Sequence, residues 1–250
     1  MQQKAYTRRG FIQAFSLPLF IPAVNVHASI PDMVKLAALL KKPDPLTWVF
    51  TGDSVTQGAH HTYGGRCYPE IIAERIRWEL RRITDIVINS GVNGTNTKYL
   101  LDGFEWYVAR FRPSVVSVMY GINDCQENAI TIPLFRQYLS EIIQRVRQQN
   151  AIPVIHTPNG IDMKGMMTMK TASRSQLPEY VNVITEVAER EQCIVADHWK
   201  YWEGRPAALT RNWLDDPLHP NAEGHLQMAR LFFKVTDTFD DHSFTCAGKK

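Results

Sequence analysis

The stretch Trp48-Val49-Phe50-Thr51 (WVFT) is a short apolar run that ends just before Gly52-Asp53-Ser54. Near-continuous apolarity is typical of a strand that is covered on both faces of a parallel sheet. Four further runs of this kind follow, with amphipathic stretches between them, which predicts an α/β fold. The expected strands are Trp48–Thr51, Ile86–Asn89, Val115–Tyr120, Pro153–Thr157 and Ile194–Asp197.

The amphipathic stretches predict the helices that cover this sheet. In Pro133–Gln149, apolar residues recur at spacings of three and four, as the buried face of one helix requires. We expect a three-layer α/β/α fold with a five-stranded parallel sheet in the flavodoxin-like order 2-1-3-4-5. The expected helices are Tyr68–Ile83, Thr97–Ala109, Pro133–Gln149, Glu179–Glu191 and Ala222–Val235. Residues 158–178 and 199–217 show no clear period.

The N-terminal residues resemble an export signal. Lys4, Arg8 and Arg9 precede an apolar run from Ala14 to Val24, and small residues lead to a candidate cleavage site after Ala28. The run is too short for an ordinary membrane-spanning helix. The two arginines suggest the twin-arginine route, with the general route left open. A basic arm with an apolar anchor is the alternative interpretation. We expect an exported protein, periplasmic or secreted, with one domain over residues 29–250.

Charge and cysteine content narrow the classes of partner. The formal net charge is +3, and residues 1–28 carry three basic and no acidic side chains, so 3 − 3 leaves a neutral mature chain. Neutrality gives no reason to expect binding to nucleic acid or to an anionic membrane. No later segment approaches the length of a membrane span. The four cysteines lack Cys-x-x-Cys spacing, and the sequence does not decide whether they form disulfides.

The segment Asp216-Pro217-Leu218-His219 supplies a base for Ser54. A serine hydroxyl becomes a useful nucleophile when a neighbouring base accepts its proton. Neutral His219 suits that task, and Asp216, three residues earlier, is placed to orient it. Asp215 is an adjacent competitor for the orienting role. Taken alone, each segment has a plainer interpretation: Ser54 caps a turn, and Asp216 and His219 form an Asp–His pair on the surface.

Gly94 and Asn123 are candidates to stabilise negative charge on a carbonyl oxygen. A glycine lets the backbone approach a substrate closely, Asn123 offers a side-chain amide, and the backbone N–H of Ser54 is a third donor. The alternative is that Gly91 and Gly94 only form turns and that Asn123 shapes a loop. Because Ser54, Gly94 and Asn123 each follow one of the first three strands, we expect them at one edge of the sheet.

Three residues near these segments are candidates for contact with the substrate. His60 and Tyr63 follow the nucleophile, and Trp213 precedes Asp216 in a segment rich in aromatic residues. An aromatic ring near a reactive centre is a platform for sugar rings, but buried packing explains the tryptophan equally well. The adjacent His60 and His61 lack the carboxylate or cysteine spacing of a metal site, so no metal and no cofactor are expected.

Together these segments resemble the SGNH (GDSL) hydrolase family, whose conserved blocks carry Ser, Gly, Asn and His in that order. The resemblance runs from Ser54 to His219. It implies that Ser54 is the nucleophile, that Gly94 and Asn123 are oxyanion donors, and that Asp216 and His219 complete the triad. Gly91 is the alternative residue for the glycine block. Valine follows Ser54 where Leu or Ile is common, a difference that leaves the chemistry intact.

The sequence therefore predicts a serine esterase that works through an acyl-enzyme. The preferred substrate is a small-molecule or glycan ester, with O-deacetylation of a carbohydrate as the leading hypothesis. A lipid-directed esterase, such as a lysophospholipase or thioesterase, is the alternative within the enzymes. A non-catalytic glycan-binding module on the same fold is the alternative outside them.

Overall fold

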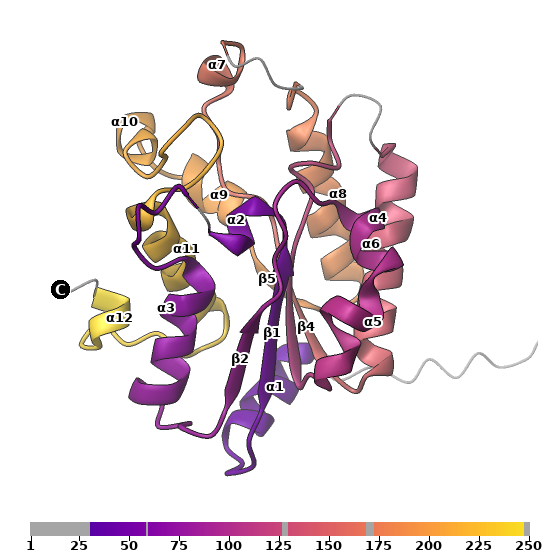
Figure 1. Ribbon diagram of the computed structural model, residues 1–250, viewed down its shortest axis with the longest axis vertical. Coiled ribbons are helices and arrows are strands. Elements are labelled where there is room, and N and C mark those ends of the chain that lie inside the picture. Colours follow the sequence, from indigo (N-terminus) through magenta and orange to yellow (C-terminus); the bar gives the residue numbers. More distant parts are fainter. Residues whose placement is uncertain (1–30, 59, 127–129, 169–172, 248–250) are drawn as a thin grey trace, which may run out of the picture.

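Five parallel strands form one twisted sheet at the centre of the domain (Figure 1). The computed structural model describes residues 31–58, 60–126, 130–168 and 173–247. The strand order β2-β1-β3-β4-β5 confirms the predicted topology. Each strand lies within a residue or so of its predicted bounds: β1 Thr47–Gly52, β2 Ile86–Asn89, β3 Val115–Met119, β4 Ile152–His156 and β5 Ile194–Ala196.

Helices cover both faces of the sheet and give the expected three layers. One face packs against α1 (Asp32–Leu40), α3 (Tyr68–Glu74) and α11 (Ala222–Val235). The other packs against α4 (Thr97–Asp102), α5 (Phe104–Tyr107), α6 (Ile132–Gln148) and α8 (Leu177–Arg190). Because side chains alternate along a strand, Trp48 and Phe50 of β1 enter the first core and Val49 enters the second.

Two predicted helices are interrupted. The α-helix that begins at Tyr68 ends at Glu74 and continues as one π-helical segment, η1 (Arg75–Glu79), in which the N–H of Leu80 bonds to the carbonyl of Arg75. The stretch Thr97–Ala109 divides at Gly103 into α4 and α5, and a 3₁₀ turn, η2 (Ala109–Phe111), follows. A side chain at Gly103 would meet the Tyr107 ring at 2.7 Å, so the break allows close packing.

Several short helices were not predicted. They are α2 (Ser54–Gln57), α7 (Met163–Met166), α9 (His198–Glu203), α10 (Ala207–Arg211) and α12 (Phe244–Ala247), in addition to α1. Helices of four to six residues complete too few turns to show an apolar period. Side-chain caps help to define three of them, because Asp53 accepts from the N–H of Val55, Asp162 from that of Gly165 and Asp197 from that of Lys200.

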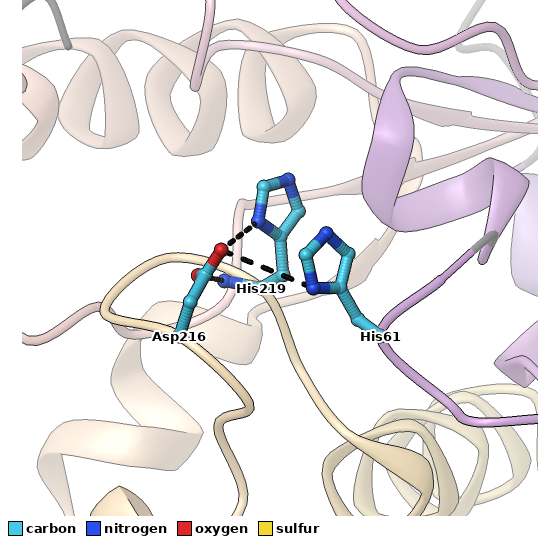
Figure 2. Close-up of side chains that lie close together, drawn as sticks. All are labelled: His61, Asp216 and His219. Carbon is cyan, nitrogen blue, oxygen red and sulfur yellow. Dashed lines mark hydrogen bonds and ion pairs between the residues drawn. The ribbon is translucent and has the colours of Figure 1, made fainter.

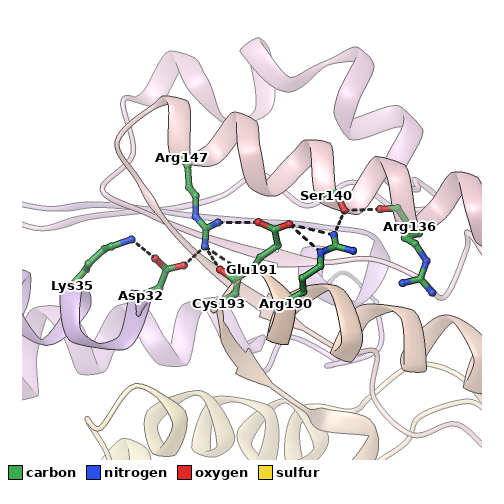
Figure 3. Close-up of polar contacts among 8 residues, drawn as sticks. All are labelled: Asp32, Lys35, Arg136, Ser140, Arg147, Arg190, Glu191 and Cys193. Atoms are coloured by element: carbon green, nitrogen blue, oxygen red, sulfur yellow. Dashed lines mark hydrogen bonds and ion pairs between the residues drawn. The ribbon is translucent and has the colours of Figure 1, made fainter. Parts of the chain in front are cut away.

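An arginine-centred cluster (Figure 3) joins α1, α6 and the end of α8 at the edge of the sheet that lies away from α2 (Figure 1). The Arg147 guanidinium, at the end of α6, lies 2.9 Å from the buried carboxylate of Asp32 and 3.2 Å from that of Glu191. A buried carboxylate is costly unless it is paired. Arg147 therefore fastens α1 and the end of α8 to α6, and the cluster is structural.

The four cysteines are free thiols in this structure. Burial raises the pKa of the Cys125 thiol to about 12, so the thiolate that nucleophilic attack requires is scarce near neutral pH. Among the residues that the structure describes, no helix has both the length and the apolarity needed to cross a membrane. The expected export signal, residues 1–28, lies outside the described residues.

Candidate active site

Ser54 lies at the carboxyl end of β1, as the first residue of α2. The preceding residue, Asp53, caps this helix by accepting a hydrogen bond of 3.0 Å from the N–H of Val55. Asp53 is buried, and burial raises its pKa to about 7. The strand and the cap together hold the Ser54 hydroxyl at the edge of the sheet, beside the β1–β3 boundary where the strand order reverses and where ligands bind in such folds.

Ser54, His219 and Asp216 form one hydrogen-bonded chain. The Ser54 hydroxyl lies 3.0 Å from Nε2 of His219, and Nδ1 of the same ring lies 2.8 Å from Oδ2 of Asp216. The other oxygen of Asp216 accepts two backbone N–H groups, from Leu218 and His219, each at 2.7 Å. This carboxylate is therefore held in one orientation. Its neighbour Asp215 bonds to a different histidine, His61.

The electrostatics of this chain suit a neutral imidazole beside an ionised carboxylate. Burial lowers the pKa of His219 below its usual value, and Asp216 acts in the opposite direction. Burial alone would raise the pKa of Asp216, but the hydrogen bonds from His219 and Leu218 outweigh it and the pKa is lowered. Near pH 7 the arrangement can therefore accept the hydroxyl proton of Ser54 and stabilise the imidazolium that forms.

The loop that carries Asp216 and His219 is held at both ends. Leu214 and Pro220 form an antiparallel bridge across it. Asn221 caps α11 by accepting the N–H groups of Glu223 and Gly224, while its own amide donates to the carbonyl of Asn212. At Gly224 a Cβ would lie only 2.2 Å from the Trp213 carbonyl, so helix and loop touch backbone to backbone.

Asn123 and Gly94 lie on neighbouring loops at the same edge. Asn123 follows β3 and is buried, and its amide donates to the carbonyl of Thr95 at 2.9 Å. Gly94 occupies the turn before Thr95 with φ +75°, a backbone conformation that favours glycine. The hydrogen bond thus connects the turn after β2 to the loop after β3. Gly91 instead allows close packing, because a Cβ at this position would lie only 2.7 Å from the backbone of α2.

Further residues support Asn123, and two of them carried no recognisable sequence signal. The Asn123 amide oxygen accepts from Gln126 at 3.0 Å and from Arg174 at 3.2 Å. Arg174 comes from the 158–178 segment, which has no period to reveal it. Asp124, next to Asn123 in the motif, accepts from the N–H groups of Thr97 and Gly121, each at 2.9 Å. Asn123 is therefore presented in one orientation.

The substrate-side candidates occupy different environments. His60 is exposed, with φ +68°. Tyr63 is also exposed, and its hydroxyl donates to Asp215 at 2.7 Å. Trp213 is 4% exposed and packs against Trp202, with ring centroids 5.0 Å apart, and against Tyr201. Its burial favours the packing interpretation over a sugar platform.

His61, which the sequence offered only as a loop residue beside His60, is a neighbour of the site. Figure 2 shows its ring over that of His219, with the centroids 3.8 Å apart and the planes 5° from parallel. Ligand atoms of His61, Asp216 and His219 lie within 4.8 Å of one another, as those of a metal site do. However, imidazole binds metal in the plane of its ring, and an ion between two stacked rings would lie outside both planes. The geometry suits hydrogen bonding better.

The comparisons with known proteins identify the family of the chain. The model of the GDSL-like Lipase/Acylhydrolase family matches residues 50–226, which include every residue of the hydrogen-bonded chain. The chain belongs to this family. Membership of the GDSL-like family places it among the carboxylic ester hydrolases and confirms the resemblance inferred from the sequence.

Two curated relatives are similar over part of the chain. The acetylxylan esterase of Geobacillus stearothermophilus is 25% identical over 162 residues, which cover 59% of this chain and 70% of that protein. An uncharacterized protein of Mycoplasma pneumoniae is 29% identical over 115 residues. This match covers 44% of the chain but spans only 13% of the length of the Mycoplasma protein.

Solved structures share the GDSL-like fold at low sequence identity. An acetyl xylan esterase structure has a TM-score of 0.64 at 22% identity and covers 76% of this chain and 99% of its own. An alpha/beta hydrolase enzyme from the metagenome of Lake Arreo, Spain, has a TM-score of 0.62 at 22% identity, with coverage of 77% and 95%. At these identities the likeness establishes the fold.

Proposed function

We propose that the protein is an exported serine esterase that removes O-acetyl groups from a carbohydrate or glycan. The observation that carries the esterase chemistry is the hydrogen-bonded chain from Ser54 through His219 to Asp216, with O–N distances of 3.0 and 2.8 Å. His219 takes the proton of Ser54 as the hydroxyl attacks the ester carbonyl. The imidazolium then protonates the departing alcohol, and an acyl-enzyme remains. Water, activated by the same histidine, releases the acid.

The negative charge that develops on the carbonyl oxygen needs N–H donors. We assign these to the backbone N–H groups of Ser54 and Gly94 and to the side-chain amide of Asn123. One amide N–H of Asn123 already bonds to Thr95, which leaves the second for the oxyanion. Removing one such donor typically costs about 3 kcal/mol of transition-state stabilisation. The mechanism requires no metal and no cofactor.

A carbohydrate substrate is supported by a cavity beside the loop that carries the proposed base. The cavity has a volume of about 630 Å³, and its lining includes the half-buried Trp199 and the charged side chains of Lys164 and Glu203. A flat apolar ring with polar groups around it suits sugar rings and their hydroxyls. Leu214 and Asp162 line the cavity and also contact the loop, through the bridge to Pro220 and a hydrogen bond to the Pro217 carbonyl. The acetylxylan esterase relative points to the same substrate class.

The decisive experiment compares the enzyme with Ser54→Ala on short-chain aryl esters and on a panel of acetylated glycans. We expect acetate release by the parent and none by the variant, with both folded. Equal activity in the variant would rule out Ser54 as the nucleophile. Glycan binding without hydrolysis of any ester would indicate a binding module. An acyl-chain series that favours long chains would indicate a lipid substrate, and loss of activity in EDTA would indicate a metal.

The proposal of export rests on the N-terminal sequence. Three basic residues, an apolar run and small residues before position 29 form the pattern of a cleavable signal. Expression of the full chain in a bacterial host, followed by fractionation and N-terminal sequencing, tests it. We expect a processed protein outside the cytoplasm that begins near Ser29. An unprocessed cytoplasmic protein would contradict the proposal.

A further inference from the structure

The ring of His61 lies flat against the ring of His219 (Figure 2), with a centroid separation of 3.8 Å and an interplanar angle of 5°. His219 is already held in its plane by Ser54 and Asp216. These in-plane bonds allow the ring to tilt out of plane, and a flat neighbour in contact with one face opposes that motion. We infer that His61 is a positioning residue for His219. The inference rests on the proposed role of His219 as the base.

The carboxylate of Asp215 holds His61 in place. Its Nδ1 lies 2.8 Å from Oδ2 of Asp215, and the Tyr63 hydroxyl donates to Oδ1 of the same group at 2.7 Å. The side chains of His61 and Asp215 are only 23% and 20% exposed. Asp215 therefore orients His61 much as Asp216 orients His219. The result is two parallel His–Asp pairs, built from consecutive carboxylates of one loop and histidines from two distant segments.

The stack also affects the proton affinity of His219. The titratable groups that face the pair are Asp215, Asp216, Tyr63 and His225. Burial is the main cause of the lowered pKa of His219, and charge on His61 acts in the same direction. Because the His61 ring covers one face of His219, its removal would admit water there and remove a competing positive charge. Both effects favour protonation of His219.

The test compares His61→Ala, His61→Phe and Asp215→Asn with the parent enzyme on an aryl acetate, across the pH range. His242→Ala, at a 92% exposed histidine, is the matched control and should behave like the parent. We expect His61→Ala to lower kcat about ten-fold or more, to change KM less than about two-fold, and to move the acid limb of kcat/KM to higher pH by about half a unit. His61→Phe keeps a flat ring and should restore part of kcat.

Asp215→Asn should lower kcat in the same direction as His61→Ala, and the double variant should lose little more than either single variant, since both changes disturb one stack. Thermal unfolding of every variant checks that the fold is retained. The inference is overturned if the parent is active and His61→Ala retains its kcat and acid limb. It is also overturned if His61→Ala raises KM alone, because His61 would then contact substrate. An inactive parent would instead refute the proposed function.

Discussion

Replacement of Asp216 by asparagine is the sharpest test of the hydrogen-bonded chain, because the structure determines how the amide must lie. Oδ1 of Asp216 accepts two backbone N–H groups at 2.7 Å. In Asp216→Asn this position must be filled by the amide oxygen, since an NH₂ group there would face two donors. The NH₂ group then occupies the position of Oδ2, which lies 2.8 Å from Nδ1 of His219.

A donor at that position forces Nδ1 of His219 to accept a hydrogen bond. The ring proton must then be on Nε2, which faces the Ser54 hydroxyl at 3.0 Å. A protonated Nε2 cannot accept the proton of the nucleophile. In a Ser-His-Asp enzyme this wrong tautomer costs about 10⁴-fold in kcat. We expect a loss of about 10³- to 10⁴-fold here, which corresponds to about 4 to 5.5 kcal/mol.

The assay is the hydrolysis of an aryl acetate at saturating substrate, with KM measured in parallel and folding checked by circular dichroism. The matched control is Asp215→Asn, which removes the same charge from the adjacent position but leaves the tautomer of His219 unaffected. Its loss should be nearer ten-fold. A loss of less than ten-fold in Asp216→Asn, or equal losses in the two variants, would refute the tautomer argument.

Three further predictions follow from the environment of the site. Because burial lowers the pKa of His219, kcat/KM should fall on acidification with a midpoint below 6.5; a midpoint above 7, or a flat profile down to about pH 4, would contradict its role as the base. Burial lowers the pKa of His156 and His225 to about 3 and also lowers that of His198. From pH 6.5 down to about 3 the unfolded chain therefore binds protons that the folded chain does not, and each histidine lowers the free energy of unfolding by up to about 1.4 kcal/mol per pH unit. The raised pKa values of Asp53 and Asp124 act in the opposite direction and offset part of this loss of stability. Because the three histidines outweigh the two carboxyl groups, urea unfolding should show a lower free energy of unfolding at pH 5 than at pH 6.5. Finally, Gly224→Ala gains about 1 kcal/mol of helix propensity but places a Cβ 2.2 Å from the Trp213 carbonyl. The cost of overpacking, about 2 to 3 kcal/mol, should dominate, so the free energy of urea unfolding and the rate of aryl acetate hydrolysis should both decrease. A stabilised, fully active variant would show that the loop adapts.

Local sequence patterns predicted the sheet and the long helices well. An apolar run predicts a strand and an apolar face predicts a long helix. Ala222–Val235 therefore has the predicted bounds, and so does Ile86–Asn89, although this edge strand is partly exposed and not covered on both faces as expected. The short helices could not be predicted in this way. In α9, the side chain of Asp197 caps the first turn and His198 and Trp202 are buried, so packing against distant residues helps to decide the conformation. In α10 no residue is buried, and its five residues are too few to show an apolar period.

The sequence by itself determined the strands, the family and the chemistry that Ser54 and His219 bring, because apolar period and side-chain type are local properties. Only the tertiary structure decided which groups meet. It brought together Ser54 and His219, which are 165 positions apart, and chose Asp216 over Asp215 as the partner of His219. It also buried Trp213 and stacked His61 on His219. Such contacts depend on how loops from different strands pack against one another, and no local pattern records that packing.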